Sequence, residues 1–227
     1  LEYPAMSLAA FVDESARRIP VRFDGDVVIL GGGSAGIASA VAAARLGASV
    51  LVVERYGYFG GIMTAISLGT ICGLYGVGVD GEAVQLVAGI AGEVIQRLHA
   101  IDGAAAPKRW IGAITVPYDL FSLKIVLDEM VVASGARIAF HAQVVDVVVE
   151  HGEVKAAIIQ DKSGRWAARA KVFIDCTGDA DLVAQAGGAF EFDLGALQLP
   201  TTTFRLGGIV DAESRTVSRE DLRERLE

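Results

Sequence analysis

Apolar residues fall in short runs that alternate between strand-like and helix-like periods. A β-branched apolar run over 26–30 precedes a glycine-rich turn. A helix pattern of small residues over 35–46 and a second apolar run over 49–53 come next. A strand, a helix and a second strand in this order form a βαβ unit with parallel strands. The pattern therefore predicts an α/β fold with a parallel central sheet.

The rest of the chain predicts further helices and strands. Helical spacing covers 81–100 and 118–134, whereas 65–79 is rich in glycine and has no clear period. Strands are expected over 111–116, 137–141, 143–150, 154–161, 166–170 and 172–175. Short turns separate the strands between 143 and 170, so we expect an inserted β-meander there. The run at 172–175 is expected to return to the parallel sheet.

These elements divide the chain into parts. Residues 7–18 form either a short amphipathic helix or a solvated segment, and 201–210 is expected to be a strand. The predicted division is an N-terminal arm (1–25), a nucleotide-binding domain (26–64 and 119–190), an inserted helical and irregular segment (65–118) and the start of a substrate domain (191–227).

A G-x-G-x-x-G motif directly follows the first strand, at Gly31, Gly33 and Gly36. Gly31 permits a tight turn, Gly33 lets the backbone approach a pyrophosphate, and Gly36 lets the helix pack close to the strand. The amide groups and the dipole at the helix N-terminus favour phosphates. Glu54 follows 18 residues after Gly36, at the end of the second strand, where it can bind a ribose. The spacing predicts a Rossmann-like domain that binds a dinucleotide.

Composition and charge exclude several classes of protein. The net charge of −8 argues against nucleic-acid binding, which needs clustered Lys and Arg. The two longest uncharged stretches do not predict membrane spans, because one contains the phosphate turn and the other is dense in glycine. Cys72 and Cys176 are far apart in the sequence, which fits a reducing compartment, so we expect a cytoplasmic protein.

Two further motifs carry a family resemblance. Glu54-Arg55 is followed by the pair Gly60-Gly61 and Thr64, and the strand over 172–175 runs into Cys176-Thr-Gly-Asp-Ala-Asp181. These motifs resemble the E-R, G-G-x-x-T and C-T-G-D-x-D patterns of FAD-dependent oxidoreductases in the glutathione-reductase-type FAD-binding class. The resemblance covers about residues 18–210 and corresponds to the N-terminal part of such proteins.

The resemblance implies FAD as the cofactor and hydride transfer between the flavin and a small organic substrate. It implies that Glu54 binds the adenosine ribose and that Val144 contacts the adenine ring. It also places the insertion near the flavin and the substrate. The residues expected to bind the cofactor are Gly31, Gly33, Ser34, Ala35, Gly36, Glu54, Arg55, Gly60, Gly61, Thr64, Val144, Thr177, Gly178 and Asp179.

The catalytic residues are unknown from the sequence, although the insertion offers candidates. Cys72 could be a reactive thiol, Tyr75 could line a substrate pocket, and Arg109 could hold a carboxylate. Each has a structural alternative, because free cysteines are commonly buried and an arginine at a turn is commonly solvated. No histidine has a partner at metal-ligand spacing, so no metal site is expected.

Two other functions fit the same motifs. One is an NAD-using enzyme similar to thiazole synthases, and the other is a non-catalytic subunit that binds a nucleotide. A capping box over 218–221 begins a helix in which the sequence ends. We therefore expect a continuation that is either carried by a second polypeptide with the C-terminal half, within a hetero- or homo-oligomer, or missing from this sequence, as in one fragment of a cleaved precursor.

Overall fold

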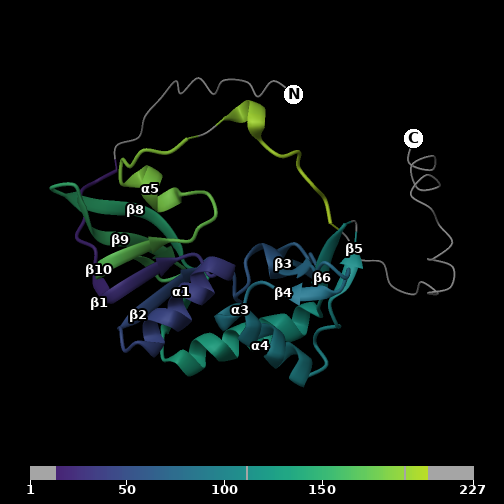
Figure 1. The fold of residues 1–227 in the computed structure, drawn as a ribbon. Coiled ribbons are helices and arrows are strands. Elements are labelled where there is room, and N and C mark those ends of the chain that lie inside the picture. Colours follow the sequence, from purple (N-terminus) through teal and green to yellow (C-terminus); the bar gives the residue numbers. More distant parts are fainter. Residues whose placement is uncertain (1–13, 111, 192, 204–227) are drawn as a thin grey trace.

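In the computed structural model, a six-stranded sheet forms the centre of the α/β part of the chain. The structure describes residues 14–110, 112–191 and 193–203. The strand order of this sheet is β7-β2-β1-β10-β9-β8 (Figure 1). The strands are β1 (Val21–Leu30), β2 (Val50–Glu54), β7 (Arg137–Phe140), β8 (Gln143–Glu150), β9 (Glu153–Asp161) and β10 (Gly164–Asp175). The first four in the spatial order are parallel, whereas β9 and β8 are antiparallel, as expected for an attached meander.

Both faces of the parallel strands are covered. Ile29, Val50 and Val52 belong to one buried cluster with the helices α1 (Ser34–Arg45), α3 (Gly89–Ala100) and α4 (Leu120–Ser134). The alternate residues Val28, Leu30, Leu51 and Val53 belong to a second cluster that includes Val144, Ile159, Trp166 and Leu182. This division follows from the period of two in a strand. It explains why the strand sequences are continuously apolar, as is typical of parallel sheets.

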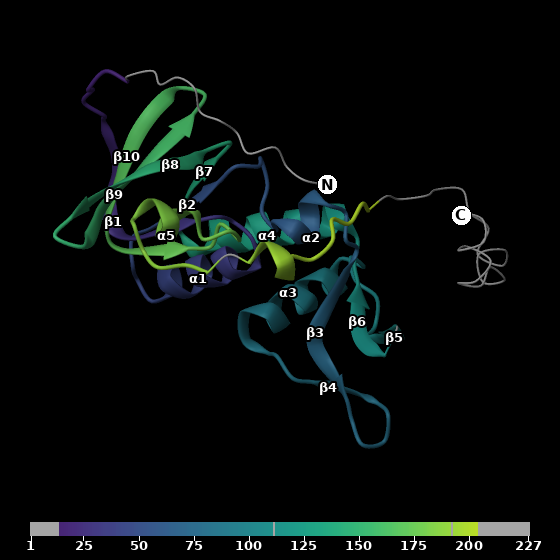
Figure 2. The same ribbon diagram turned by 90° about the horizontal axis from the view of Figure 1, so that it is seen from above.

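The insertion forms a second, four-stranded sheet in the order β4-β3-β6-β5. Its strands are β3 (Thr70–Val77), β4 (Ala83–Gln85), β5 (Lys108–Trp110) and β6 (Ala113–Pro117), all antiparallel to their neighbours. In Figure 2 the β3–β4 hairpin extends away from the six-stranded sheet, while α3 and α4 run beneath both sheets in Figure 1. The remaining short elements are α2 (Ile62–Ala65), α5 (Asp181–Gln185) and a single 3-10 turn (Leu194–Ala196).

Helix α4 illustrates how local sequence sets the ends of an element. Its N-cap, Asp119, accepts a hydrogen bond from the Ser122 amide at 2.9 Å. Its C-cap, Gly135, has φ of 84°, a left-handed conformation that glycine adopts without strain. The helix predicted over 118–134 is therefore confirmed nearly to its ends.

Several sequence predictions about elements were wrong. Residues 65–79, expected to be irregular, contain β3. The helix expected over 81–100 begins only at Gly89, because β4 occupies Ala83–Gln85. The two strands expected over 166–170 and 172–175 are one continuous strand, β10, and β1 begins at Val21 rather than at residue 26.

Other predictions fall partly or wholly beyond the described residues. Residues 14–18 are not helical, and the rest of the possible helix over 7–18 lies outside the described part. Residues 201–203 are not a strand, and the rest of the expected strand and the helix after 218 also lie outside it. Among the helices that the structure describes, none has the length and apolar character needed to cross a bilayer.

Candidate functional site

A cavity of about 650 Å³ opens where the parallel strands β1, β2 and β10 end. It is lined by the C-terminal ends of these strands, the start of α1, α2, and the loop that follows β10. Ligands of open α/β sheets bind outside the carboxyl ends of the strands, so the cavity lies where the topology favours a ligand. Its volume is within the range of small-molecule and cofactor sites.

The glycine turn after β1 is packed too tightly for a side chain at the first and third glycines of the motif. A Cβ at Gly31 would lie 2.2 Å from the Cys176 carbonyl oxygen, and Gly31 has φ of 103°. A Cβ at Gly36 would lie 1.9 Å from the Gly31 carbonyl oxygen. These glycines let α1 and the end of β10 approach the turn. Their roles in the tight turn and in close helix packing are those expected from the motif.

Gly33 differs from the other two because its surroundings are open. A Cβ there would contact only the Gly61 Cα, at 3.9 Å, and φ of −74° suits any residue. A Cβ at Gly61, by contrast, would lie 2.9 Å from the Gly33 Cα. The two backbones thus meet in the cavity wall. The described fold would therefore accommodate a side chain at position 33. A ligand in contact with the backbone there would require glycine.

The N-terminus of α1 faces this cavity without a capping side chain. Gly33 is the N-cap residue, no side chain caps the helix, and its first turn contains no acid. Ser34 and Ala35 in that turn line the cavity. Amide groups in the first turn of a helix have no partner within the helix, and the dipole makes this end positive. The site is therefore suited to an anion such as a pyrophosphate.

Glu54 is a buried carboxylate beside the glycine turn. It is 4% exposed, and its Oε2 accepts a hydrogen bond from the Gly32 amide at 2.7 Å. Its Oε1 accepts another from the Tyr56 amide at 2.7 Å. These two bonds fix the carboxylate at the end of β2. Each oxygen still has a lone pair for a ribose hydroxyl, because a carboxylate oxygen accepts two hydrogen bonds.

Aromatic and apolar groups form the part of the cavity next to Glu54. The Arg55 guanidinium lies 5.0 Å from the centroid of the Tyr56 ring, and Tyr56 stacks on Tyr58 with centroids 5.7 Å apart. Val144, which is buried at the start of β8, lines the cavity together with Tyr56. A planar, largely apolar group such as adenine suits these surroundings.

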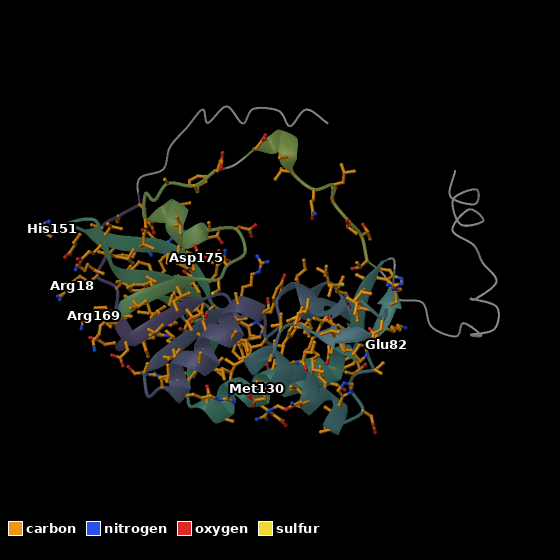
Figure 3. The ribbon with its side chains drawn as sticks, in the orientation of Figure 1. Arg18, Glu82, Met130, His151, Arg169 and Asp175 are labelled. Carbon is orange, nitrogen blue, oxygen red and sulfur yellow. The ribbon has the colours of Figure 1, made fainter. Side chains whose placement is uncertain are left out.

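The loop after β10 is held by one carboxylate, Asp175. Its Oδ1 accepts hydrogen bonds from the Thr177 amide at 3.0 Å and the Thr177 hydroxyl at 2.7 Å. Its Oδ2 accepts from the amides of Leu182 at 3.0 Å and Val183 at 3.2 Å. Figure 3 shows Asp175 beneath α5, whereas Arg18, His151 and Arg169 lie at the left of the view, away from Asp175. Asp175 therefore ties the start of α5 to the Thr177-Gly178 turn.

The structure brings the predicted cofactor residues together. All of them line the cavity except Gly36, Gly60 and Thr64. Gly36 packs against the turn, Gly60 donates to the Gly32 carbonyl at 2.9 Å, and the Thr64 hydroxyl donates to the Phe59 carbonyl at 2.8 Å. These three support the wall from behind. Direct contact of any of the predicted residues with a cofactor stays a prediction.

Sequence reasoning missed several lining residues, which are Leu30, Val53, Tyr56, Ile62, Ala65, Ile66, Ala142, Gln143, Asp175, Cys176 and Asp181. Most are apolar neighbours of the motif residues and carry no signal of their own. Asp175 did carry one, because a carboxylate at the end of a buried apolar strand needs partners. Cys176 is half-buried, and burial raises the pKa of its thiol.

The candidate catalytic residues do not gather at this cavity. Tyr75 packs partly buried against the main core, and Arg109 is exposed on β5, so both lie outside the cavity lining. Cys72 is exposed on β3, in a second cavity described below. Among the described residues, no group of three or more His, Cys, Asp or Glu is placed to hold a metal ion.

The family model for FAD dependent oxidoreductases matches residues 26–226. The chain belongs to this family. Membership favours FAD over the NAD-using alternative.

The two solved structures below with TM-scores of 0.50 and 0.51 share the fold of this chain. The flavin-dependent brominase Bmp2 is 20% identical with a TM-score of 0.51, and the match covers 72% of this chain and 40% of Bmp2. A flavocytochrome c3 fumarate reductase is 20% identical with a TM-score of 0.50, covering 68% of this chain and 34% of that chain. THI4 from Thermovibrio ammonificans is 20% identical with a TM-score of 0.49, covering 71% and 60%.

The chain thus spans less than two thirds of the length of each of these structures. No match was found among curated proteins.

Proposed function

We propose that the 650 Å³ cavity binds FAD through its ADP half, and that the chain supplies the FAD-binding part of an oxidoreductase acting on a small organic molecule. The observation that carries this proposal is the open backbone at Gly33, at the uncapped N-terminus of α1. The fold leaves room for a side chain at position 33, so a glycine there is explained by a ligand that contacts its backbone. Family membership supports FAD as that ligand.

Each part of the ADP half has a suitable group in the cavity. Glu54 would bind the ribose hydroxyls, and the first-turn amides of α1 would bind the pyrophosphate. Tyr56 and Val144 would contact the adenine. The turn at Thr177-Gly178, held by Asp175, would close the other side of the cavity. Bound FAD supplies a flavin ring that accepts or donates a hydride, and the protein positions it.

Further polypeptide would complete the substrate site. The chain covers 60% or less of the three solved structures named above, which supports a substrate domain beyond the described residues. Whether that part lies on a second chain, and whether the assembly is an oligomer, stays a prediction. A cytoplasmic location also stays a prediction.

Two alanine substitutions in the same turn test the proposal. Gly33→Ala adds a methyl group that the fold accommodates but that would occupy the place of the pyrophosphate. We expect this variant to unfold at the wild-type temperature and to bind FAD at least about 100-fold more weakly, which is about 2.7 kcal/mol. FAD titration of the full chain, with NAD⁺ in parallel, measures this.

Gly36→Ala is the matched control. Its Cβ would lie 1.9 Å from the Gly31 carbonyl oxygen, so this variant is expected to lose stability as well as FAD. Wild-type FAD affinity in a folded Gly33→Ala variant would contradict the proposal. A wild-type chain that prefers NAD⁺ over FAD would contradict the choice of cofactor.

A further inference from the structure

A second cavity of about 450 Å³ lies between the insertion and the nucleotide-binding domain. Its walls come from α1, β3, α3 and α4, and include Ile37, Ile71, Leu74, Ile90, Val94 and Leu127. We call it the apolar cleft. Its volume is within the range of small-molecule sites, and protein interiors hold few voids larger than a water molecule. A space of this size is therefore suited to an occupant.

The apolar cleft adjoins the cofactor cavity. Ser34, at the N-terminus of α1, lines both. The short helix α2 lies between them, because Ile62 and Ala65 line the cofactor cavity whereas Met63 lines the cleft. A molecule in the cleft would lie next to whatever occupies the phosphate end of the cofactor cavity.

The lining of the cleft limits the chemistry of its occupant. Among the described residues, no Asp, Glu, Lys, Arg or His lines it, and its polar lining residues are Ser34, Thr70 and Cys72. An ion would lose its hydration there without gaining a counter-charge, so charged molecules are disfavoured. The cofactor cavity differs, because Glu54, Arg55, Asp175, Asp179 and Asp181 line it.

We propose that the apolar cleft binds an uncharged, largely apolar organic molecule, and that this molecule is the substrate presented to the flavin. The assignment as substrate rests on the proposed FAD-binding function, whereas the binding itself does not. Cys72 lies exposed in the cleft wall, and this thiol reports whether the cleft is filled.

The first experiment measures binding of Nile red, an uncharged aromatic dye, to the full chain with and without FAD. Ala91→Phe places a ring into the cleft from α3 and is expected to abolish dye binding. Ala100→Phe, at the exposed end of the same helix, is the matched control and is expected to bind dye normally. Both variants are expected to retain FAD, because neither residue lines the cofactor cavity.

The second experiment tests the class of ligand and the place of binding. The uncharged 2-naphthylmethanol is expected to displace the dye, whereas the 2-naphthoate anion is not. With dye at about ten times its Kd, about one tenth of the clefts stay open, so N-ethylmaleimide should label Cys72 about tenfold more slowly. Peptide mass spectrometry distinguishes Cys72 from Cys176.

Each contrary outcome is distinct. Equal dye binding by Ala91→Phe, or equal displacement by 2-naphthoate, would overturn the assignment. A Cys72 that is already unreactive in the dye-free chain would mean that polypeptide covers the cleft, which also overturns it. A full chain that binds the dye normally but does not bind FAD would contradict the proposed function and leave the binding of an uncharged molecule in the cleft standing.

Discussion

At the residue scale, Asp175 has more hydrogen bonds than the sequence motif around it suggested. One carboxylate accepts from the amide and hydroxyl of Thr177 and from the amides of Leu182 and Val183. An asparagine at position 175 would have one acceptor oxygen instead of two. It could accept from the Thr177 donors or from the amides at the start of α5, and the other pair of donors would have no acceptor.

Asp175→Asn is therefore expected to destabilise the protein by about 1–3 kcal/mol and to weaken FAD binding, because the Thr177-Gly178 turn loses its support. Denaturant unfolding and FAD titration measure the two effects. Asp179→Asn changes an exposed residue of the same loop, and its effect on stability is expected to stay within about 0.5 kcal/mol. Equal stability of both variants would show that Asp175 does not hold the loop.

Thr70 offers the opposite case, a polar group whose removal should help. Its hydroxyl is buried and has no hydrogen-bond partner among the described residues. Valine has the same shape and favours strands, so Thr70→Val is expected to stabilise the chain by about 1 kcal/mol. Thermal unfolding measures this. A lower unfolding temperature would mean that the hydroxyl has a partner.

At the element scale, Glu93 connects two helices, α1 and α3. The Glu93 carboxylate accepts hydrogen bonds from both terminal guanidinium nitrogens of Arg45 on α1, at 2.7 and 2.9 Å. It also forms an ion pair with Arg97, one turn along α3, at 2.9 Å. The hydrogen bonds from Arg45 lower the pKa of Glu93 from 4.5 to about 2. A carboxyl group with a lowered pKa stabilises the folded state above its unfolded pKa, and this contribution is lost as the pH falls toward 2.

We therefore expect Glu93→Gln to be less stable than wild type at pH 7 by about 1 kcal/mol, since the ion pair is partly exposed. The difference should shrink between pH 4.5 and about 2, where the wild-type carboxyl becomes protonated. Urea unfolding of both proteins across this range measures it. A difference that is constant with pH would mean that the carboxylate charge does not connect the helices.

Sequence reasoning predicted the elements whose apolar period is regular. The run at 26–30, the helix after it and the helix over 118–134 were found because burial on one or both faces determines their residues. β3 was missed because its many glycines and half-exposed side chains give no alternation. β10 was divided in two because the exposed, charged residues Arg169 and Lys171 interrupt its apolar sequence.

The site was predictable where the backbone itself is constrained. Gly31, Gly33 and Glu54 have roles fixed by spacing, and the structure places all three in one cavity. Lining residues such as Tyr56 and Gln143 come from strand ends and loops, where no periodicity identifies a side chain that faces the cavity. The apolar cleft could not be predicted, because it forms only where β3 and α3 of the insertion meet α1 and α4.

At the scale of the whole molecule, bound FAD is expected to stabilise the folded state. A ligand that binds only the folded state stabilises it by about 2.7 kcal/mol when its concentration is 100 times Kd. We expect the unfolding temperature of wild type to rise steadily with FAD concentration, and that of Gly33→Ala to stay constant. A rise in both proteins would place the FAD contacts away from the glycine turn.

The most direct test of the central claim is a displacement titration on the full chain with bound FAD. In the proposed function, the described residues would contact the ribose, pyrophosphate and adenine of the ADP half. ADP is therefore expected to release FAD, and FMN at the same concentration is not, because FMN lacks that half. A chain that binds no FAD, or one from which FMN displaces FAD and ADP does not, would contradict the account.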